Sequence, residues 1–441
     1  MPLLYPELRL ITLDGNEDSY ILTEDSFYKN LWGNAGGDTL QGNSSDNVIN
    51  GDAGDDTMIG GAGNDTYGVY DEGDVIIEHE GGGTDTVMVT TNYTLSAFVE
   101  NMILRDNAIR GTGNAQANAI TGHEIDNVLF GEGGDDTLDG GAGADYMDGG
   151  TGNDVFIVDS EKDVVVEAAG GGYDTVHASI SFSLADKPDI EAVVLTGFAA
   201  IDAVGNDADN SLTGNDAANV LIGGLGNDVL NGRGGADYMD GGDGDDTYHV
   251  DQAGDAIQDS SGVDTVVTTA SYGLASYLEN LMAAGSDAIG LFGNDLANTI
   301  TGNAAQNTIT AGLGNDTVNG GYGNDTLSGG AGKDFFVFDS ALNKKGNVDK
   351  ITDFKVKDDT VWLDNAIFTK LSGGSALSPK MLSSKYFTIG SKAQDKNDFI
   401  VYDSKTGYLS YDADGSGKGA AVLFAKLSKN LKMTNKDLFV I

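Results

Sequence analysis

Residues 113–157 read GNAQANAIT GHEIDNVLF GEGGDDTLD GGAGADYMD GGTGNDVFI, which are five units of nine residues without a break. In every unit the sixth residue is Asp or Asn and the eighth is apolar or aromatic. Blocks of the same unit occupy residues 33–68, 205–249 and 293–337, so the chain holds nineteen units in four blocks. Such a fixed period is typical of repeat architectures, and here it decides the fold.

The nine-residue period predicts a turn of six residues followed by a strand of three. Glycine in the turn supplies the positive φ angles that tight turns need. Side chains alternate along a strand, so the eighth residue of each unit points inward. Two units make a coil of 18 residues, and stacked coils place parallel strands about 4.8 Å apart. We therefore expect an all-β fold, a parallel β-roll or β-solenoid, over residues 33–340.

The acidic residue at the sixth place predicts a metal. Adjacent coils stack these side chains, and a column of carboxylates about 5 Å apart is repulsive unless a cation lies between them. Carboxylates and turn carbonyls offer oxygen ligands only, which suits Ca²⁺ better than Zn²⁺. The chain has no cysteine, so thiolate metal sites and disulfides are excluded.

The unit G-G-x-G-x-D-x-U-x, as in GGAGADYMD at residues 140–148, resembles the nonapeptide of the repeats-in-toxin (RTX), or haemolysin-type, calcium-binding family. The resemblance implies a parallel β-roll with Ca²⁺ bound in the turns on both sides, between units i and i+2, to a maximum of about eleven ions. It implies that the aspartates at the sixth place are ligands: Asp38, Asp56, Asp65, Asp136, Asp145, Asp154, Asp228, Asp237, Asp246, Asp316, Asp325 and Asp334. It implies that carbonyls of the turn glycines complete each site: Gly61, Gly63, Gly141, Gly143, Gly150, Gly152, Gly224, Gly226, Gly242, Gly244, Gly321, Gly323, Gly330 and Gly332.

Seven units carry a neutral residue at the sixth place, namely Asn47, Asn118, Asn127, Asn210, Asn219, Asn298 and Asn307. These half-sites are either weak calcium sites or coils that are capped by Asn without metal, and we favour the Asn-capped coil.

The segments between the blocks, residues 69–112, 158–204 and 250–292, also repeat one another, since they carry GGTDTVMVT, GGYDTVHAS and SGVDTVVTT. We expect irregular β coils that continue the solenoid. Four separate rolls on flexible linkers are the alternative, which the apolar content and the near absence of proline disfavour. Residues 1–32 are expected to cap the N-terminal end, with Trp32 closing the first coil.

The charge marks a second boundary. The chain has 69 acidic and 24 basic residues, for a net charge of −45, yet residues 341–441 hold 16 lysines against 11 aspartates. We expect a Lys-rich, β-rich capping domain over residues 341–441, whose start resembles the capping strands of serralysin-type RTX domains. Such acidity excludes nucleic acid as a partner, and no apolar run reaches the roughly 20 residues of a transmembrane segment.

Two motifs in the C-terminal part allow two interpretations each. Asp412 and Asp414 are spaced like the start of an EF-hand loop, but Leu423 stands where the loop needs Glu, so an ordinary β-turn is favoured over an isolated calcium site. Residues 437–441, an acid followed by apolar residues, resemble an uncleaved type I secretion signal and also suit a last β-strand. The first 17 residues do not resemble a cleaved secretory signal.

No catalytic constellation is expected. His123 and Glu124 begin like a zinc-protease HExxH motif, but Asn127 stands in place of the second His. There is no nucleophile elbow and no phosphate-binding loop, so the protein is not expected to be an enzyme.

The resemblance to RTX proteins implies a calcium-binding protein of a Gram-negative bacterium that uses type I secretion machinery and acts outside the cell or at its surface. We expect a structural protein that forms homo-oligomers or polymers, as in an S-layer, a filament or a biofilm. A calcium-dependent adhesin, or lectin-like binder of acidic polysaccharide or lipopolysaccharide, is the alternative, and a polysaccharide-modifying enzyme comes last.

Overall fold

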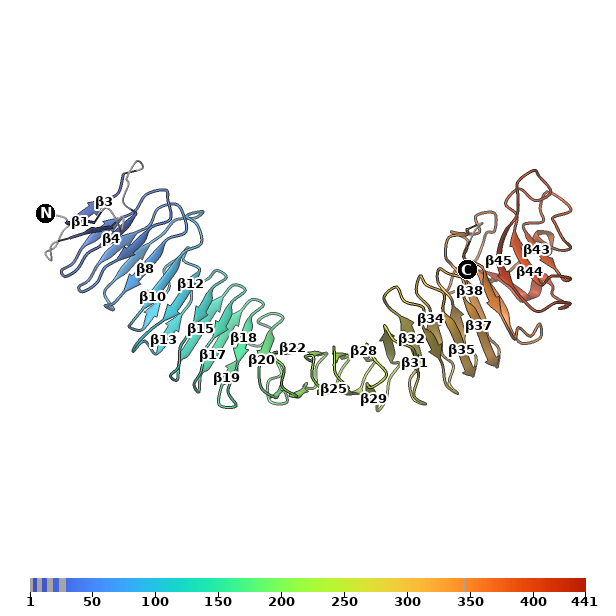
Figure 1. Ribbon diagram of the computed structural model, residues 1–441, viewed down its shortest axis with the longest axis horizontal. Coiled ribbons are helices and arrows are strands. Elements are labelled where there is room, and N and C mark those ends of the chain that lie inside the picture. Colours follow the sequence, from blue (N-terminus) through green and yellow to red (C-terminus); the bar gives the residue numbers. More distant parts are fainter. Residues whose placement is uncertain (1–2, 6–9, 14–18, 24–28, 344–345) are drawn as a thin grey trace. The chain divides into compact units, whose positions relative to one another are not determined.

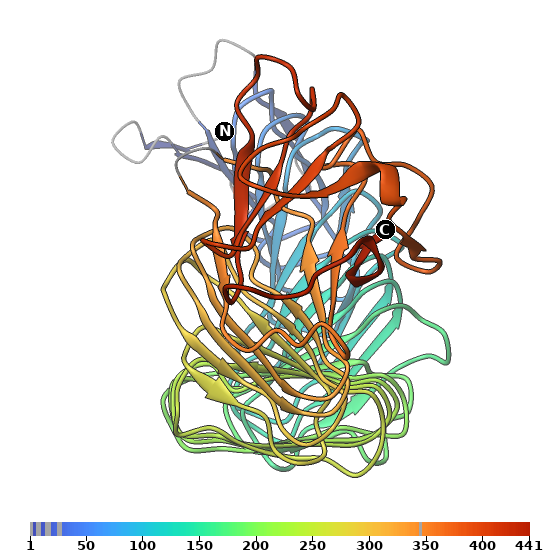
Figure 2. The ribbon, with the colours of Figure 1, turned by 90° about the vertical axis from the view of Figure 1, so that its right-hand side faces the viewer.

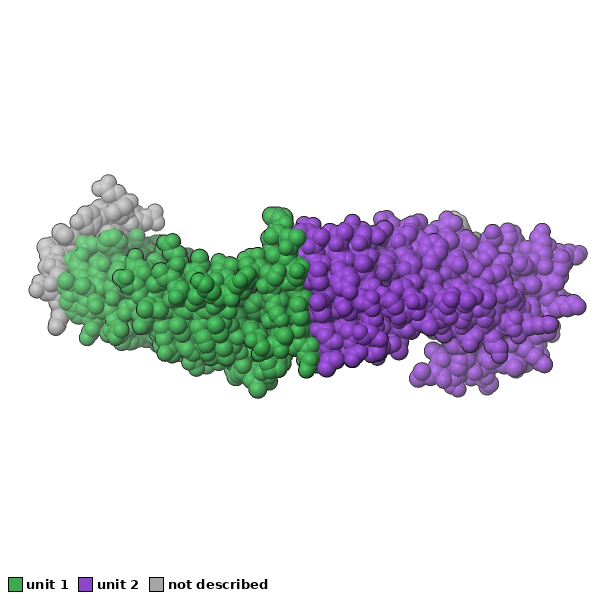
Figure 3. Space-filling view, turned by 90° about the horizontal axis from the view of Figure 1, so that it is seen from below, with its two compact units in different colours: residues 1–215 green, residues 216–441 purple. Residues whose placement is uncertain are grey.

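The computed structural model describes residues 3–5, 10–13, 19–23, 29–343 and 346–441, and the chain divides into two compact units, residues 1–215 and 216–441 (Figure 3). Within the described residues the structure is made of β-strands, with two short 3₁₀ turns at Ser384–Tyr386 and Asn435–Asp437. No helix in the described part of the chain is long and apolar enough to span a membrane. The predicted all-β parallel solenoid is confirmed.

In unit 1 one face of the solenoid is a continuous parallel sheet, whose strands lie side by side in Figure 1. Its strands are β2 (Leu10–Thr12), β4 (Asn30–Trp32), β6 (Val48–Asn50), β8 (Thr66–Val69), β10 (Thr86–Val89), β12 (Asn101–Leu104), β14 (Ala119–Thr121), β16 (Thr137–Asp139), β18 (Val155–Val158), β20 (Thr175–Ala178), β22 (Ala192–Leu195) and β24 (Ser211–Thr213).

The second face of unit 1 consists of shorter parallel sheets. Its strands are β3 (Ser19–Ile21), β5 (Thr39–Gln41), β7 (Thr57–Ile59), β9 (Val75–Ile77), β11 (Tyr93–Thr94), β13 (Arg110–Thr112), β15 (Val128–Gly133), β17 (Tyr146–Thr151), β19 (Val164–Val166), β21 (Phe182–Ser183) and β23 (Ala203–Val204). Figure 2 shows the coils as flattened loops. The strands β15 and β17 are six residues long rather than the predicted three, because they continue into the turn of the next unit.

The segments between the blocks continue the solenoid. Within a block the partners on the first face are 18 residues apart, as in Thr137↔Val155. In the first insert the spacing is 20 residues at Thr66↔Thr86 and 15 at Thr86↔Asn101. The coils therefore change length without leaving the stack, as expected for irregular β coils and not for flexible linkers.

The nonads contribute one column of core side chains on each face, and four-residue strands such as β8 and β18 bury a second residue. All nineteen residues at the eighth place of the nonads are completely buried, from Leu40 in the first block to Phe336 in the last. In the strand β4 Leu31 is buried, whereas the neighbouring Trp32 is 39% exposed. The prediction that Trp32 closes the first coil is therefore wrong, because strand alternation turns Leu31 inward and Trp32 outward.

Unit 2 repeats the same two-faced stack. Its first face contains β26 (Val229–Asn231), β28 (Thr247–Val250), β30 (Thr265–Thr268), β32 (Asn280–Ala283), β34 (Thr299–Thr301), β36 (Thr317–Asn319), β38 (Phe335–Phe338), β40 (Thr360–Leu363) and β46 (Leu438–Val440). Its second face contains β25 (Val220–Leu225), β27 (Tyr238–Asp243), β29 (Ala256–Gln258), β31 (Tyr272–Gly273), β33 (Gly290–Phe292), β35 (Thr308–Leu313), β37 (Thr326–Ala331), β39 (Asp349–Ile351) and β45 (Val422–Lys426).

The Lys-rich segment extends both faces of unit 2. The strand β46 adds to β40 in parallel, and β41 (Lys380–Met381) pairs with β46 in the antiparallel sense. On the other face β45 pairs with β39, and an antiparallel sheet follows with β44 (Tyr408–Tyr411) and β43 (Ile400–Asp403), beside β42 (Phe387–Ile389).

Aromatic residues take over the core at this end of unit 2. The Phe368 ring lies 5.1 Å from that of Phe424 and 5.2 Å from that of Tyr411, and Phe338 lies 5.0 Å from Phe424, all edge to face. The segment thus covers the last coil with a wider core than the nonads provide. The boundaries predicted near residues 32 and 340 are not those of the two compact units, and they stay predictions.

Turn glycines let the coils approach closely. A methyl group on Gly152, whose φ is +131°, would lie 2.0 Å from the carbonyl oxygen of Gly134 in the preceding coil. Gly170 also has a positive φ, of +70°, but nothing lies within 4 Å of the corresponding position.

We expect Gly170→Ala to cost about 1 kcal/mol, because only the left-handed backbone conformation opposes the change. Gly152→Ala should cost about 3 kcal/mol or more, because the methyl group also forces two coils apart. Urea unfolding in the presence of Ca²⁺ measures both variants. Equal destabilisation of the two would contradict this account of coil stacking.

Candidate calcium sites

The twelve aspartates predicted as ligands are all buried, with at most 2% of each residue exposed. Each lies directly before a short strand, where the turn ends. Along a column, Oδ1 of one aspartate accepts a hydrogen bond from the backbone N–H of the column residue 18 positions earlier. Asp136 accepts from Asn118 at 2.6 Å, and Asp154 accepts from the N–H of Asp136 at 2.7 Å. The aspartates thus hold successive coils together.

The second carboxylate oxygen has no such partner. In ten of the twelve aspartates Oδ2 is buried and no hydrogen bond reaches it: Asp56, Asp65, Asp136, Asp145, Asp154, Asp237, Asp246, Asp316, Asp325 and Asp334. A buried anionic oxygen without a donor is costly. A cation is the group that these atoms fit.

Glycine at the first place of the nonad makes room for this oxygen. A methyl group on Gly131 would lie 2.3 Å from Oδ2 of Asp136 and 2.5 Å from the carbonyl oxygen of Gly149. The small space beside Gly131 is therefore lined by a carboxylate and a carbonyl, the oxygen donor set that Ca²⁺ prefers. This role was not predicted from the sequence, where the roles expected of turn glycines were a positive φ and, at the second and fourth places, a carbonyl ligand.

The fourteen glycines predicted as carbonyl ligands all have positive φ, between +75° at Gly141 and +156° at Gly143. They lie where the coils touch: a methyl group on Gly150 would come within 2.3 Å of the Glu132 carbonyl oxygen. Their place in the turns agrees with the predicted role, and coordination by their carbonyls stays a prediction.

Several asparagines at the sixth place differ from the aspartates, since hydrogen bonds use both ends of their amides, whereas Nδ2 of Asn307 is buried without a partner. Asn118 Oδ1 accepts from the N–H of Asn114 at 2.7 Å, and its Nδ2 donates to the Val99 carbonyl at 3.0 Å. Asn298 does the same with Asn294 and Leu278. A neutral amide that the chain itself satisfies has no need of a cation, which supports the Asn-capped coil.

The acidic columns continue beyond the nonads, which sequence reasoning missed. The continuation uses residues after each block, in the inserts and in the Lys-rich segment, whose carboxylates accept from the backbone N–H of the last column residues: Asp74, Asp85, Asp163, Asp174, Asp255, Asp264, Asp349 and Asp359. Three glutamates extend these columns by one more residue, since they accept from the backbone N–H groups of Asp85, Asp174 and Asp264: Glu100, Glu191 and Glu279. A signal was present, because the shared G-x-D-T of the inserts puts an acid before a strand, as the nonad does.

Burial raises the pKa of several aspartates in the nonad columns. The pKa of Asp136 rises to about 7 and that of Asp237 to about 6, because desolvation disfavours the charged form and neighbouring acids add repulsion. Backbone hydrogen bonds oppose the rise only in part. Without an ion, the fold therefore favours the protonated side chains.

The other two sequence motifs form turns. Residues 412–421 connect β44 to β45, where the N–H of Gly415 donates to the Asp412 carbonyl at 3.3 Å and Asp414 Oδ2 accepts from the N–H of Gly419 at 2.9 Å. Asp412 Oδ1 is buried without a hydrogen-bond partner, so the ordinary turn and the isolated calcium site both stay predictions. The segment that begins like HExxH is also a nonad turn, since Asn127 Oδ1 accepts from the N–H of His123 at 2.8 Å.

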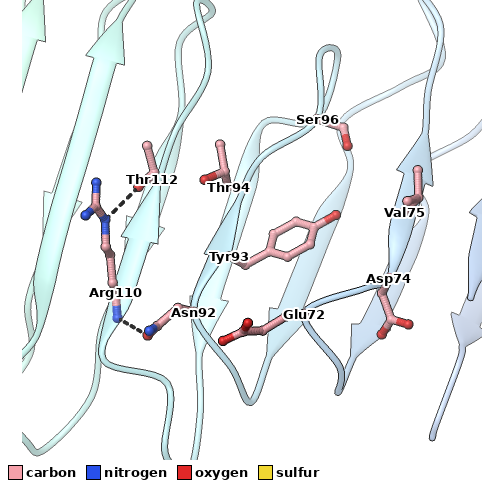
Figure 4. Close-up of a pocket in the computed structure, with 9 residues that line it drawn as sticks. All are labelled: Glu72, Asp74, Val75, Asn92, Tyr93, Thr94, Ser96, Arg110 and Thr112. Atoms are coloured by element: carbon pink, nitrogen blue, oxygen red, sulfur yellow. Dashed lines mark hydrogen bonds between the residues drawn. The ribbon is translucent and has the colours of Figure 1, made fainter. Parts of the chain in front are cut away.

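A shallow hollow of about 480 Å³ lies on the second face of unit 1, around β9, β11 and β13 (Figure 4). Tyr93, Glu72 and Arg110 line it, among other polar residues. The Arg110 side chain is held in place, because its Nε donates to Thr112 Oγ1 at 3.3 Å and its guanidinium lies 4.4 Å above the Phe130 ring.

Comparison with known proteins adds two findings. The model of the RTX calcium-binding nonapeptide repeat (4 copies) matches residues 32–67, 121–156, 213–248, 292–321 and 312–340. The solved structure of the extracellular lipase LipA from Serratia marcescens is 13% identical, with a TM-score of 0.16. That match covers 81% of this chain and 45% of the lipase chain, so the chain spans less than half of the lipase's length. The curated proteins gave no match.

The residues that the repeat model matches fall in all four nonad blocks, where the buried aspartate columns lie. The predicted resemblance is confirmed: the chain carries RTX calcium-binding nonapeptide repeats, folded as a parallel β-roll.

Proposed function

We propose that this chain is a secreted protein that folds when it binds calcium outside the cell and then serves as a structural subunit of the cell surface or extracellular matrix. The observation that carries the proposal is the set of ten buried aspartate Oδ2 atoms that no donor reaches. Since the unfolded chain has no preformed site, the free energy of calcium binding is folding free energy.

Charge links this mechanism to export. With a net charge of −45, the ion-free chain repels itself and stays expanded. Calcium is scarce in the cytosol and reaches millimolar concentrations outside, where weak sites of extracellular modules fill. We propose that the chain leaves through type I secretion machinery before it folds. Residues 438–440, part of the segment that resembles a type I secretion signal, form the strand β46 in the folded chain.

The structural role is supported by repetition and by charge asymmetry. Repeats occupy most of residues 33–340, and the Lys-rich residues 341–441 carry a net positive charge beside an acidic remainder. Opposite charges on one chain favour contacts between copies, and head-to-tail contacts that do not close produce filaments or sheets. An S-layer, a filament or a biofilm matrix would use such contacts. The role needs no catalysis, and we propose that the chain is not an enzyme.

The hollow beside Arg110 favours a second function. An immobilised guanidinium suits a carboxylate ligand, and the neighbouring Tyr93 and Glu72 can hydrogen-bond hydroxyl groups (Figure 4). A calcium-dependent adhesin for acidic polysaccharide would bind its uronic acid residues there. Loss of polysaccharide binding in Arg110→Ala, with folding intact, would support this alternative.

Removal of calcium should unfold the protein. We expect EGTA to abolish the β signal in far-ultraviolet circular dichroism, because the carboxylate columns are then left buried and unpaired. Addition of excess Ca²⁺ should restore the signal, whereas Mg²⁺ at the same concentration should restore little, because it dehydrates reluctantly. A chain that keeps its β signal in EGTA would contradict the mechanism.

Calcium binding should weaken in acid. The pKa values of Asp136 and Asp65 rise to about 7 in the ion-free fold, so protons compete with Ca²⁺ below neutrality. Between pH 7.5 and 5.5 the apparent affinity should fall at least about tenfold. Calorimetry in two buffers of different ionisation enthalpy should also show proton release on binding.

The stability of the ion-free fold should depend on pH in the opposite direction to calcium binding. Between about pH 4 and pH 7 it binds more protons than the unfolded chain, whose aspartates have ordinary pKa values near 4. Its stability therefore decreases as the pH rises through this window. A calcium affinity that does not depend on pH would show that the columns are already ionised.

The state of assembly distinguishes the structural subunit from the adhesin. With Ca²⁺ present, we expect regular filaments or sheets in negative-stain electron microscopy, and dispersal at high salt if contacts between acidic and Lys-rich segments hold the copies together. Particles that remain monomeric at all calcium and salt concentrations would contradict the structural role and favour the adhesin.

A further inference from the structure

The first three nonad blocks each end in a group of three carboxylates, which we call the exit trios; all members are buried except Glu167, which is half-buried. In each trio one oxygen atom from each residue lies within 4.8 Å of the other two. The trios are Asp65–Glu78–Asp85, Asp154–Glu167–Asp174 and Asp246–Asp259–Asp264. The first member ends the nonad column and the third continues it into the insert. The second member comes from the opposite face and is unrelated to the sixth-place pattern.

Strand register brings the second member to the column. Pairing of Asp148 with Val166 in β17 and β19 puts Glu167 beside Gly149, a glycine at the first place of its nonad. A methyl group on Gly149 would lie 2.4 Å from Asp154 Oδ2 and 2.4 Å from Glu167 Oε2. Both oxygens are therefore aimed at the same small space.

None of the three oxygens in the second trio is satisfied. Asp154 Oδ2, Glu167 Oε2 and Asp174 Oδ2 are buried without any hydrogen-bond partner, and the two aspartates are completely buried. The connecting residues 168–173 contain no Lys or Arg. Lys187 lines a hollow with Glu167, but its ammonium group pairs with Asp186 at 2.8 Å. The described part of the chain therefore brings three carboxylates together without an ion pair to any of them.

At the first and third exits a tyrosine hydroxyl donates a hydrogen bond to the second acid of the trio. At the third exit the Tyr248 hydroxyl donates to Asp259 Oδ1 at 2.7 Å, and at the first exit Tyr67 donates to Glu78. The second exit has Phe156 at this place, so Glu167 lacks the hydroxyl donor.

The fourth block exit has no open trio. Asp353, which occupies the place of Glu167, accepts from Ser328 Oγ at 2.7 Å and from the N–H of Gly330 at 2.8 Å. The Lys355 ammonium group donates to the Gly330 carbonyl. Here the chain provides its own donors and its own positive charge.

We propose that Asp154, Glu167 and Asp174 together bind one calcium ion, that the other two exit trios are equivalent sites, and that the three sites fill before the nonad columns. Ca²⁺ takes oxygen ligands at 2.3–2.6 Å, so the oxygens of one site lie up to about 5 Å apart, which the trios satisfy. A nonad site between units i and i+2 offers two aspartates, whereas a trio offers three acids. Calcium affinity rises with the number of charged ligands. This inference extends the proposed function, since it rests on a roll that binds calcium.

Competition with a chromophoric chelator, together with native mass spectrometry, measures the number of ions in the tightest class. We expect three in the full-length wild type and two in Glu167→Gln. Glu167→Asp should keep three, because Asp259 is the natural residue at the third exit. Glu161→Gln removes an exposed acid of the same insert and should also keep three.

Three tight ions in Glu167→Gln, or an equal loss in Glu161→Gln, would overturn the proposal. If Glu167→Gln does not fold, Asp259→Asn with Asp259→Glu as its control provides the same test in unit 2, with the same expected counts. The proposed function and the exit-trio proposal are contradicted by different results. Folding of the wild type in EGTA would contradict the proposed function, whereas an unchanged ion count in the variants would contradict only the exit trios.

Discussion

The hydrogen bond from a backbone N–H to the aspartate of the next coil is the interaction on which the rest of the structure depends. It uses one carboxylate oxygen to fix the spacing of two coils, as between Asp136 and Asp154 at 2.7 Å. The same geometry turns the other oxygen into a space where the chain offers no donor. The bond that stacks the coils thus creates the need for a cation. A solenoid with one core residue per strand has little hydrophobic free energy with which to offset that need.

Glycine makes this arrangement possible in two distinct ways. At the second and fourth places it provides positive φ and lets coils approach, as at Gly152. At the first place φ is ordinary, and the missing side chain instead leaves room for a carboxylate, as at Gly131. Asparagine is compatible with the same turn because its amide hydrogen-bonds within the stack, as Asn118 does. Asp and Asn at the sixth place therefore leave different demands on the stack, since the aspartate keeps an oxygen without a donor and the Asn118 amide does not.

The nine-residue period was sufficient to predict the parallel roll, the buried eighth residue and the aspartate columns, because each follows from strand alternation and local turn chemistry. What it could not predict depends on register between distant strands. Glu167 meets Asp154 only because β17 and β19 pair as they do, and no local spacing encodes that contact. The outward position of Trp32 was not predicted, because before the first nonad the repeat does not show which residues of a strand point inward. The column positions of Asp85 and Asp174 could have been predicted from the sequence, since their G-x-D-T motif repeats the end of a nonad turn.

The contrast between the fourth block exit and the other three shows how the chain distributes its positive charge. Lys355 lies beside the last coil of the fourth block, within the segment that holds 16 of the 24 basic residues. The Asp-bearing coils before it contain almost none, so their acids depend on a cation from solution. A chain that carried lysines throughout could neutralise its own carboxylate columns. By confining most of its cations to residues 341–441, this chain leaves the aspartate columns of the roll without counter-ions of their own.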